Sequence, residues 1–555
     1  MTHASPLDDY VSHLRGLHAG LRPPGIPDEV VYPIGEITVP AHISHWATHR
    51  PDHLALALES TRFTFAELDD AHRRVATWMS DHGVARGDRV AVYLGNSTEF
   101  AIAFLAILRL GAVHVPVNPM FQPAELAHEL IDSEPALVVT SGALRPVLDS
   151  CGDRVPAIPV LQTDGDGEFG WATATTAAPY GGDDGDLDAL AALNYTGGTT
   201  GMPKGCQHSQ RHMVYTAASA ATATALPNDG SYVSLCYLPI FWIAGEDLGL
   251  LLPFVLGGTS ILMSRWNATG AIDLIEEHRV TLMTGTVENY RELMATDDLA
   301  ARDLSSLVDP QAVSFVRKMT PEVRASWGDL VPGSVLRESS YGMTETHTID
   351  TVPYGFAEQD FDLLSEPVFC GIPVPGTDVA VVELGSQTPV PLGEVGEIIV
   401  RSPSVTDGYW RNTDATVEQL VDGWIHTGDN GRIDDRGFLH YLGRRKEMIK
   451  VNGMSVFPAD VEMLLAQHTD VDSVAVVPTD DPETGQRPVA FVVAKVGSTI
   501  TADELVAWSR QNMAPYKAPL VKVVEALPMT ATGKVRKNQL AEDAAVLNTP
   551  AGAER

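Results

Sequence analysis

Two hydrophobic periods alternate along the chain from about residue 41, and this alternation constrains the fold more than any other feature. Residues 65–82 carry apolar side chains at helical spacing and follow Thr64, a residue type that caps helix N-termini. Strand-like apolar runs at 89–94 and 112–117 surround a second helical stretch at 99–110. Strands that alternate with helices form a largely parallel sheet with helices on both faces. The sequence therefore predicts an α/β fold.

The pattern changes along the 555-residue chain, whose length predicts two to four domains. Residues 1–35 are rich in Pro, Gly and His and are expected to attach loosely. From Gly393 the segments become short and β-rich, and a small α/β unit with strands at 474–477 and 489–493 precedes a polar tail. The predicted parts are an N-terminal extension (1–35), a large domain (36–442), a hinge (443–447) and a small C-terminal domain (448–555).

Composition excludes several classes of protein. The 38 basic and 72 acidic residues give a net charge of −34, which argues against nucleic acid and anionic lipid as partners. The four cysteines have no metal-like spacing, and the N-terminus resembles no signal peptide. The longest apolar run, 248–263, contains three glycines and a proline and is too short to span a membrane. A cytoplasmic enzyme that acts on small molecules is therefore expected.

A glycine-rich run, Tyr195-Thr-Gly-Gly-Thr-Thr-Gly-Met-Pro-Lys-Gly205, follows an apolar strand at 190–193. Its glycines free the backbone to close around an anion, and its hydroxyls and N–H groups can contact phosphate oxygens. Lys204 would supply a mobile positive charge in a chain with only nine lysines. The spacing differs from that of a Walker A loop. An ordinary turn is the alternative, but the length of the unbroken run makes a phosphate loop the better interpretation.

Four further motifs carry candidate binding chemistry. In Tyr341-Gly-Met-Thr-Glu-Thr346, the aromatic ring can cover a base, and Thr344 and Glu345 offer oxygens to a hard cation such as Mg²⁺. In Thr427-Gly-Asp429, the carboxylate suits a ribose diol. The other two are basic: Gly443-Arg-Arg-Lys-Glu-Met-Ile-Lys450 with Gly453, and Thr530-Ala-Thr-Gly-Lys-Val-Arg-Lys537. Each of the last three is, taken alone, more often a solvated turn than a site.

The five motifs in this order resemble those of the adenylate-forming superfamily of acyl- and aryl-CoA ligases, luciferases and peptide-synthetase adenylation domains. The resemblance extends from about Val39 to Leu540. It implies a large N-terminal domain of two α/β subdomains plus a β-barrel, and a small mobile C-terminal α+β domain. It also implies two reaction steps. An acid attacks the α-phosphorus of ATP to give an acyl-adenylate and pyrophosphate; the small domain then rotates, and a nucleophile, usually CoA, displaces AMP.

The resemblance also implies roles for individual residues. Lys534 would bridge the incoming carboxylate and the α-phosphate, where a positioned ammonium stabilises the charge of the transition state. Lys446 would be the hinge, and Gly453 would lie beside the pantetheine arm of CoA. The remaining implied contacts are Thr196, Gly197, Gly198, Thr199, Thr200, Gly201 and Lys204 to phosphates, Tyr341 and Gly342 to adenine, Thr344 to the α-phosphate, Glu345 to Mg²⁺, Asp429 to ribose and Arg444 to ribose or phosphates.

The first departure from the family lies at the wall of the acid pocket. The family commonly has Pro-Leu-Phe-His there, whereas this chain has Pro239-Ile-Phe-Trp242-Ile243-Ala-Gly-Glu246. Trp242 is bulkier than histidine and cannot act as a base, and Glu246 adds a carboxylate near the site. The alternative is that Trp242 merely packs and Glu246 is solvated, since buried aromatic residues are more often core than site.

A second departure precedes Pro321. Where the family usually has Gly-Gly-Ala, this chain has Phe315-Val316-Arg317-Lys318. Phe and Val would fill the acyl tunnel, and the two cations would lie near the carboxylate. The alternative is a shifted alignment that leaves both cations on the surface, before a helix capped by Thr320. If the departure is real, the substrate is a small or compact polar acid.

Three functions follow from these observations. The first is an ATP- and Mg²⁺-dependent ligase that joins a small acid to CoA. The second keeps the fold but adenylates nitrite and transfers it to an arylamine. Arg317 and Lys318 would receive the tiny anion, and Glu246 would accept a proton from the amine; fold alone does not separate these two functions. The third, a non-catalytic nucleotide-binding protein, would require a broken motif, yet Glu345, Asp429 and Lys534 are all present. The sequence leaves the acid and the oligomeric state open.

Overall fold

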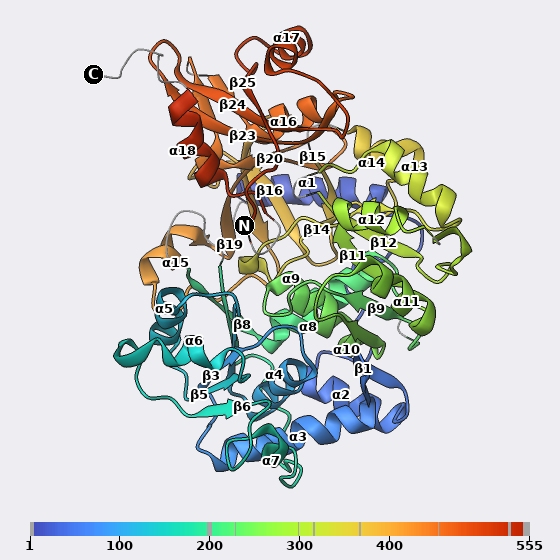
Figure 1. The fold of residues 1–555 in the computed structure, drawn as a ribbon, viewed down its shortest axis with the longest axis vertical. Helices are drawn as coiled ribbons and strands as arrows, with labels where there is room; N and C mark the ends of the chain where they lie inside the picture. The colour runs from blue at the N-terminus through green and yellow to red at the C-terminus, as the bar shows by residue number, and fades with distance from the viewer. Residues whose placement is uncertain are drawn as a thin grey trace.

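The computed structural model describes most of the chain, and the ranges it describes are 5–196, 203–227, 229–297, 299–314, 317–365, 368–452, 454–530 and 534–547. Figure 1 shows them as a stack, with two α/β layers at the bottom, an antiparallel sheet in the middle and a small C-terminal unit at the top. Across these ranges, no helix combines the length and the apolar character that a membrane crossing needs.

A six-stranded sheet forms the first layer, in the strand order β6-β5-β3-β4-β7-β8. Its first five strands pair in parallel, and β8 runs antiparallel to β7. The strands are β3 (Arg89–Tyr93), β4 (Val113–Val117), β5 (Leu137–Thr140), β6 (Val160–Gln162), β7 (Leu190–Tyr195) and β8 (Gly205–Ser209). Their continuous apolar runs suit strands covered on both faces, so the sequence prediction of buried strands here is confirmed.

A seven-stranded sheet forms the second layer, in the order β13-β12-β11-β9-β10-β1-β2. Its neighbouring strands pair in parallel, except that β2 runs antiparallel to β1. The strands are β1 (Leu54–Leu58), β2 (Thr61–Thr64), β9 (Val233–Cys236), β10 (Thr259–Leu262), β11 (Leu282–Thr286), β12 (Asp309–Val313) and β13 (Arg337–Glu338). The early strands β1 and β2 thus complete a sheet built from the middle of the chain.

Helices cover both sheets. The longer ones are α2 (Val39–His49), α3 (Phe65–Asp81), α4 (Thr98–Leu110), α5 (Pro123–Ser133), α8 (Gln210–Ala223), α11 (Ala268–His278), α12 (Val287–Met294) and α13 (Pro321–Leu330). The shorter ones are α6 (Arg145–Asp149), α7 (Trp171–Ala174), α9 (Ile243–Glu246), α10 (Leu252–Leu256), α14 (Phe361–Leu364) and α15 (Thr413–Gln419). Helix α4 contacts strands of both sheets and is buried on nearly all sides, as suits a helix between two layers.

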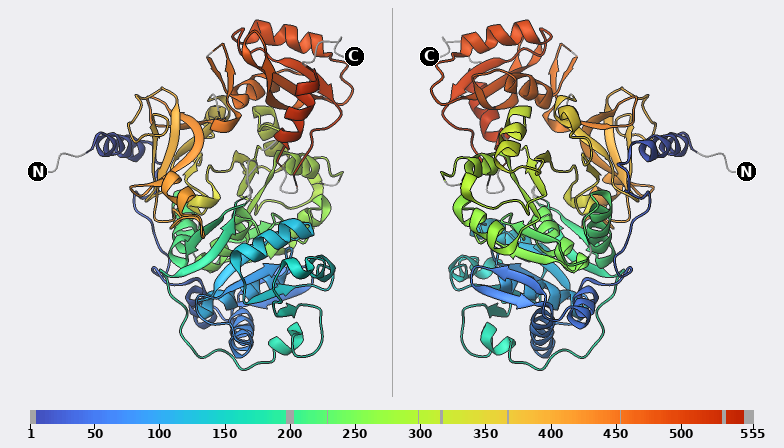
Figure 2. Two further views of the ribbon diagram at one scale, coloured as in Figure 1. Left: turned by 90° about the vertical axis from the view of Figure 1, so that its left-hand side faces the viewer. Right: turned by 90° about the vertical axis from the view of Figure 1, so that its right-hand side faces the viewer.

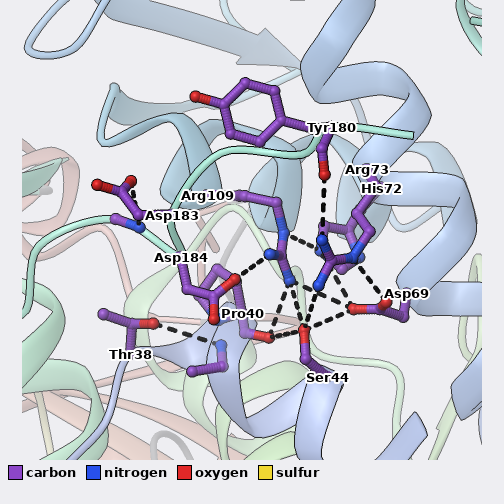
Figure 3. Close-up of polar contacts among 12 residues, drawn as sticks. Thr38, Pro40, Ser44, Asp69, His72, Arg73, Arg109, Tyr180, Asp183 and Asp184 are labelled. Atoms are coloured by element: carbon purple, nitrogen blue, oxygen red, sulfur yellow. Dashed lines mark hydrogen bonds and ion pairs between the residues drawn. The ribbon is translucent and has the colours of Figure 1, made fainter. Parts of the chain in front are cut away.

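Arg109 of α4 joins three helices and a loop although its side chain is fully buried. Its guanidinium donates to His72 Nε2 at 2.7 Å and to Ser44 Oγ at 2.7 Å, and it pairs with Asp184 (Figure 3). Asp184 belongs to the acidic segment 164–188, which the sequence predicts to be a surface loop. A buried arginine requires such paired acceptors, so this part of the loop is fixed to the core.

The third sheet is antiparallel and stands where the β-barrel was predicted. Its strand order is β14-β15-β20-β19-β17-β16, and β18 pairs with β19. The strands are β14 (Thr351–Val352), β15 (Val368–Pro373), β16 (Asp378–Val382), β17 (Gly396–Arg401), β18 (Leu420–Val421), β19 (Trp424–Ile433) and β20 (Leu439–Arg444). The predicted change to short β-rich segments after Gly393 is confirmed.

The expectation of a loosely attached N-terminal segment is wrong for α1 (Pro6–Leu21), which lies beside the third sheet (Figure 2). Three of its apolar side chains are buried in clusters with that sheet: Leu7, Val11 and Leu14. Arg15 donates two hydrogen bonds of 2.7 Å to Asp378, and His18 Nε2 lies 2.9 Å from the Gly437 carbonyl oxygen. The apolar side chains at helical spacing therefore decide the structure, despite the Pro-, Gly- and His-rich composition.

A five-stranded sheet forms the C-terminal unit, in the order β22-β21-β24-β23 with β25 beside β24. Its elements are β21 (Ile449–Val451), β22 (Met454–Val456), α16 (Pro458–Ala466), β23 (Val471–Asp481), β24 (Gly485–Ala494), α17 (Ala502–Asn512), β25 (Leu520–Val524) and α18 (Lys537–Leu547). The chain passes from the third sheet to this unit through a single 3₁₀ turn, η6 (Arg445–Glu447). The predicted fold class, a large α/β N-terminal domain followed by a small α+β domain, is confirmed.

Candidate active site

The two ends of the glycine-rich run meet at the edge of the first sheet. Strands β7 and β8 form an antiparallel pair, and the Thr196 N–H donates to the Lys204 carbonyl oxygen at 2.9 Å. Lys204 Nζ lies 4.2 Å from the centre of the Tyr409 ring. Gly197, Gly198, Thr199, Thr200 and Gly201 lie outside the described residues. The hairpin thus fixes both stems of the predicted phosphate loop.

The Tyr341 motif forms a tight, well-anchored turn, η4 (Thr344–Thr346). His208 Nε2 lies 2.8 Å from the Thr344 carbonyl oxygen. The Glu345 carbonyl oxygen accepts from the Thr406 N–H at 2.7 Å, and its carboxylate accepts from the Tyr409 hydroxyl at 2.9 Å. Tyr409 therefore stands between Lys204 and Glu345. The predicted phosphate-loop lysine and the predicted metal ligand are brought together around this ring.

Asp429 and Arg444 face each other across β19 and β20, at paired positions of the sheet. Arg444 Nε lies 2.9 Å from Asp429 Oδ1, and the Tyr341 hydroxyl donates to Asp429 Oδ2 at 2.8 Å. Burial raises the pKa of Asp429 and the charge of Arg444 opposes that shift. In return, the carboxylate raises the pKa of Arg444. The structure thus joins the residues predicted to hold adenine and ribose.

Lys534 of the C-terminal unit reaches the same place. Its Nζ lies 5.5 Å from the centre of the Trp242 ring, a distance typical of a cation–π contact. Loss of water around the ammonium lowers the pKa of Lys534, and the nearby positive charge of Arg444 lowers it further. The structure therefore brings Lys534, Trp242, Arg444 and Asp429 together between the two domains.

Trp242 and Ile243 begin α9, and Glu246 ends it. The Ile243 side chain is buried, and Glu246 is fully buried, with Asn194 Nδ2 at 3.4 Å from its carboxylate. Burial raises the pKa of Glu246 to about 7. The sequence suggests either that Glu246 offers a carboxylate to the substrate or that it is solvated. Neither interpretation describes this fully buried side chain.

The structure gives Arg317 a partner in the C-terminal unit instead of a place in the acid pocket. Its Nε lies 3.0 Å and 2.9 Å from the two carboxylate oxygens of Asp472, and Arg291 Nη1 lies 3.4 Å from the same group. Lys318 Nζ donates to the Ser314 carbonyl oxygen at 3.3 Å. Both cations precede α13, which Thr320 caps, and both are half-buried, so the structure matches neither the acid pocket nor the fully exposed surface of the alternative. Phe315 and Val316 lie outside the described residues.

A small cavity lies between the second sheet and the segment after Tyr341. Its volume is about 20 Å³, which is room for about one water molecule. Apolar side chains of three parts of the fold line it, including Leu248, Leu252 and Ile349, together with the polar Gln311 and Ser340. Since the pocket of a drug-sized ligand is commonly about 300 Å³ or more, this space by itself holds no substrate.

The sequence analysis missed a buried group of ionisable side chains below the Tyr341 motif. His347 Nδ1 lies 3.1 Å from Asp247 Oδ1, and His347 Nε2 lies 3.8 Å from Glu246 Oε1. Burial alone would lower the pKa of His347, but the two carboxylates raise it. His208 packs its ring edge-on against His347, with 4.8 Å between the centroids. The only sequence signal was the position of His347 two residues after Glu345.

Comparison with known families decides what this arrangement is. Residues 43–410 match the family described as AMP-binding enzyme, and residues 460–534 match the AMP-binding enzyme C-terminal domain. The chain belongs to the AMP-binding enzyme family. In the described ranges of this AMP-binding enzyme, no group of three His, Cys, Asp or Glu side chains could hold a metal ion. Without such a group, Glu345 could bind a metal ion only together with ligands from outside the protein. Mg²⁺ is commonly held in this way, by a carboxylate and the phosphates of a substrate.

Several relatives resemble this AMP-binding enzyme over most of its length. It is 34% identical to 4-coumarate–CoA ligase 5 of Oryza sativa subsp. japonica, over 86% of this chain and 88% of the relative. It is 30% identical to a long-chain-fatty-acid–CoA ligase of Salmonella typhimurium, over 90% and 93% of the two chains. ATP-bound MatB from Rhodopseudomonas palustris has a TM-score of 0.82 at 27% identity, over 92% and 100%. The protein is an adenylate-forming ligase.

Proposed function

We propose that this ligase uses ATP to convert a small or compact carboxylic acid into an acyl-adenylate and then transfers the acyl group to CoA. The observation that carries the proposal is the position of Lys534, which lies 5.5 Å from the Trp242 ring and close to Asp429 and Arg444. The bulk of Trp242, which stands where relatives commonly have histidine, supports a small or compact acid. The CoA ligases among the relatives support the acceptor.

ATP is held, in this proposal, by groups from three parts of the fold. The loop between Thr196 and Lys204 binds the phosphates, Tyr341 and Gly342 face adenine, and Asp429 with Arg444 binds the ribose. Gly342 leaves no room for a larger residue, because a Cβ there would lie 2.4 Å from the backbone nitrogen of Ile349. This close approach supports a flat surface for the base beside Tyr341.

The chemical step depends on two charges that reach the α-phosphate from opposite sides. Thr344 and Glu345 lie on the anchored turn, where a Mg²⁺ ion on Glu345 would neutralise phosphate charge. Lys534 approaches from the C-terminal unit with a depressed pKa, because water is displaced around it. Its ammonium stabilises the charge that gathers on the attacked phosphoryl group, a contribution of several kcal/mol for one positioned donor (about 2.7–4 kcal/mol).

The second step requires the C-terminal unit to move, and the hinge in this proposal is Lys446. It is exposed on η6, the single turn between the third sheet and the C-terminal sheet. A residue at such a connection can absorb a large change of backbone angle without breaking packed contacts. Gly453, the proposed neighbour of the pantetheine arm, lies outside the described residues. Free cysteines at the four described positions fit a reducing, cytoplasmic setting.

The nitrite alternative gains no support. It relied on Arg317 and Lys318 as receptors for a tiny anion and on Glu246 as a proton acceptor for an amine. Arg317 is paired with Asp472, Lys318 bonds to the backbone, and Glu246 is fully buried. The 4-coumarate–CoA ligase and the long-chain-fatty-acid–CoA ligase are both named for joining a carboxylic acid to CoA.

The test is a pyrophosphate-release assay with ATP, Mg²⁺ and a panel of acids from acetate to palmitate, including aromatic acids. Each acid is assayed with and without CoA, and the thioester is identified by mass. We expect pyrophosphate release with small or compact acids and thioester only when CoA is present. Efficient turnover of palmitate would contradict the size assignment. If none of the acids in the panel gave a thioester, the proposed function as a whole would be contradicted.

A further inference from the structure

The backbone after the Tyr341 motif is strained. His347, Thr348 and Ile349 have φ values of 55°, 58° and 40°, so three successive residues adopt the left-handed conformation. Residues other than glycine rarely do so, and each such residue costs about 1–3 kcal/mol. The run directly follows the turn that carries Thr344 and Glu345. Its surroundings must therefore hold it in place.

The turn is held partly by backbone contacts. The Thr348 N–H donates to the Met343 carbonyl oxygen at 2.8 Å, and the His347 carbonyl oxygen accepts from Thr216 Oγ1 at 3.0 Å. Gly342 packs directly against the run, since a Cβ there would lie 2.8 Å from the Thr348 carbonyl carbon. These contacts fix where the run lies, but they also leave the His347 side chain pointing into the core.

The His347 ring meets two carboxylates there. Asp247 and Glu246 are fully buried, at the junction of α9 and the π-helix Asp247–Leu251. Neither oxygen of Asp247 has a closer hydrogen-bond partner, and His347 Nδ1 lies 3.1 Å from its Oδ1. A buried carboxylate without a polar partner is costly, so this contact ties the start of the π-helix to the strained run.

The other polar groups around the pair extend it toward the phosphate loop. Glu246 lies 3.4 Å from Asn194 Nδ2 on β7, the strand that leads into the glycine-rich run, and 3.9 Å from His114 Nε2. His208, on β8, lies 2.8 Å from the Thr344 carbonyl oxygen and packs against the His347 ring. The buried cluster thus contacts both stems of the phosphate loop and the turn that carries the predicted metal ligand.

We propose that His347, held by Asp247 and Glu246, is a positioning residue for adenylate formation: it sets the turn that presents Thr344 and Glu345 to the phosphates and Mg²⁺. The inference rests on the proposed roles of Thr344 and Glu345. It also gives a role to the two buried carboxylates at the end of α9 and the start of the π-helix. The same helix that begins at Trp242, beside the reacting groups, thereby fixes the phosphate side of the site.

The experiment uses the full-length enzyme with three substitutions of similar shape: Asp247→Asn, His347→Asn and Glu246→Gln. Asparagine tolerates left-handed backbone, so His347→Asn removes the ring and its charge without adding strain. The matched control is His42→Asn, because His42 is also fully buried but bonds to Thr38 in α2, away from the site. Thermal unfolding is recorded for all four variants.

We expect Asp247→Asn and His347→Asn to raise the dissociation constant of Mg·ATP, measured by calorimetry without acid, by about tenfold to a hundredfold. Glu246→Gln should have a smaller effect, since it lies farther from His347. Thioester formation from a pre-made adenylate should stay within about threefold of wild type, and the Asp247→Asn/His347→Asn double variant should be no worse than either single variant. The control should lose thermal stability only.

The inference would be overturned if the variants bound Mg·ATP with the wild-type dissociation constant. It would also be overturned if the loss of binding free energy in the double variant equalled the sum of the two single losses. If one variant does not fold, the other two still decide it. Mg·ATP binding does not depend on the acid, so the two proposals fail differently. A wild-type enzyme that binds Mg·ATP but activates no acid would contradict the proposed function and leave the positioning of Glu345 measurable.

Discussion

The Lys534 ammonium lies 5.5 Å from the centre of the Trp242 ring, although the two residues belong to different domains. Trp242 caps α9 at the edge of the acid pocket, whereas Lys534 follows the C-terminal sheet. Arg444 and Asp429 influence the same ammonium. In the proposed mechanism, this is the orientation for the step in which a carboxylate attacks ATP.

This orientation predicts a selective effect of Lys534→Ala. Removing the ammonium should lower the rate of adenylate formation by about a hundredfold to a thousandfold, the cost of losing one positioned donor. Transfer from a pre-made adenylate to CoA should remain close to the wild-type rate, because Lys534 leaves the site when the domain rotates. Single-turnover assays of each half-reaction measure both values. Equal losses in both would show that the residue supports folding instead.

The hinge prediction concerns η6. Proline fixes the backbone angle φ at about −65° and therefore prevents a large rotation of the backbone. Lys446→Pro should therefore leave pyrophosphate release near the wild-type rate and reduce thioester formation by at least about a hundredfold. Lys446→Ala, which restricts no angle, is the control for loss of the charge. A normal rate of thioester formation in Lys446→Pro would rule out rotation at this residue.

The ion pair between Arg317 and Asp472 should stabilise the orientation in which Lys534 reaches the site. Arg317 is 29% exposed and Asp472 11%, and charge-assisted hydrogen bonds of this kind contribute about 1.5–3 kcal/mol when largely buried. We discount this to about 1 kcal/mol for solvent screening. Asp472→Asn should then slow adenylate formation about fivefold and not slow thioester formation from a pre-made adenylate.

Two further variants test this pair. Arg317→Gln combined with Asp472→Asn should be no slower than either change alone, because both remove the same contact. Arg279→Gln is the control, since Arg279 pairs with Asp303 within the N-terminal domain and both side chains are more than half exposed. A change of the same size in both half-reactions would contradict a conformational role.

The sequence predicted the elements whose signals are local. The helix at Phe65 begins where Thr64 caps it, and the Asp429 and Arg444 motifs meet because β19 and β20 pair. It could not predict contacts set by domain orientation, so Arg317 was assigned to the acid pocket although Asp472 lies beside it in space. The His347 cluster was missed for another reason: Asp247 lies in the same domain but a hundred residues earlier in the chain. The α1 helix was misjudged because composition was given more weight than apolar spacing.

Buried histidines predict acid sensitivity. Burial lowers the pKa of His18 and of His42 to about 4, from about 6.5 in the unfolded chain. Below pH 6.5 the unfolded chain binds more protons than the folded one, so this stability is complete above pH 6.5 and is lost as the pH falls toward 4. At pH 5, each histidine should lower the free energy of unfolding by about 2 kcal/mol.

Thermal unfolding between pH 7.5 and 5 measures this loss. The unfolding temperature should change little between pH 7.5 and 6.5 and fall from pH 6.5 to 5, and it should fall less steeply in His18→Gln, which keeps a donor for the Gly437 carbonyl oxygen. An unfolding temperature that does not change between pH 7.5 and 5 would contradict the assignment of these histidines as buried and neutral.

We expect the acid to extend toward the cavity of about 20 Å³ between the second sheet and Ile349, which has room for only about one water molecule, so substrate length should depend on the side chains that close it. Leu248 and Leu252 line it from the π-helix and α10. Each buried methylene of an acid contributes about 0.8 kcal/mol, so a closed cavity denies long acids most of their binding energy. Leu248→Ala should open the space and raise kcat/KM for an acid two carbons longer than the best substrate by about tenfold. The value for the best substrate should fall, because the cavity would then fit it poorly.

The ratio of the two kcat/KM values is the measurement, since a general loss of stability would change both together. A wild-type enzyme that prefers long acids, or an unchanged ratio in Leu248→Ala, would show that the acid binds elsewhere.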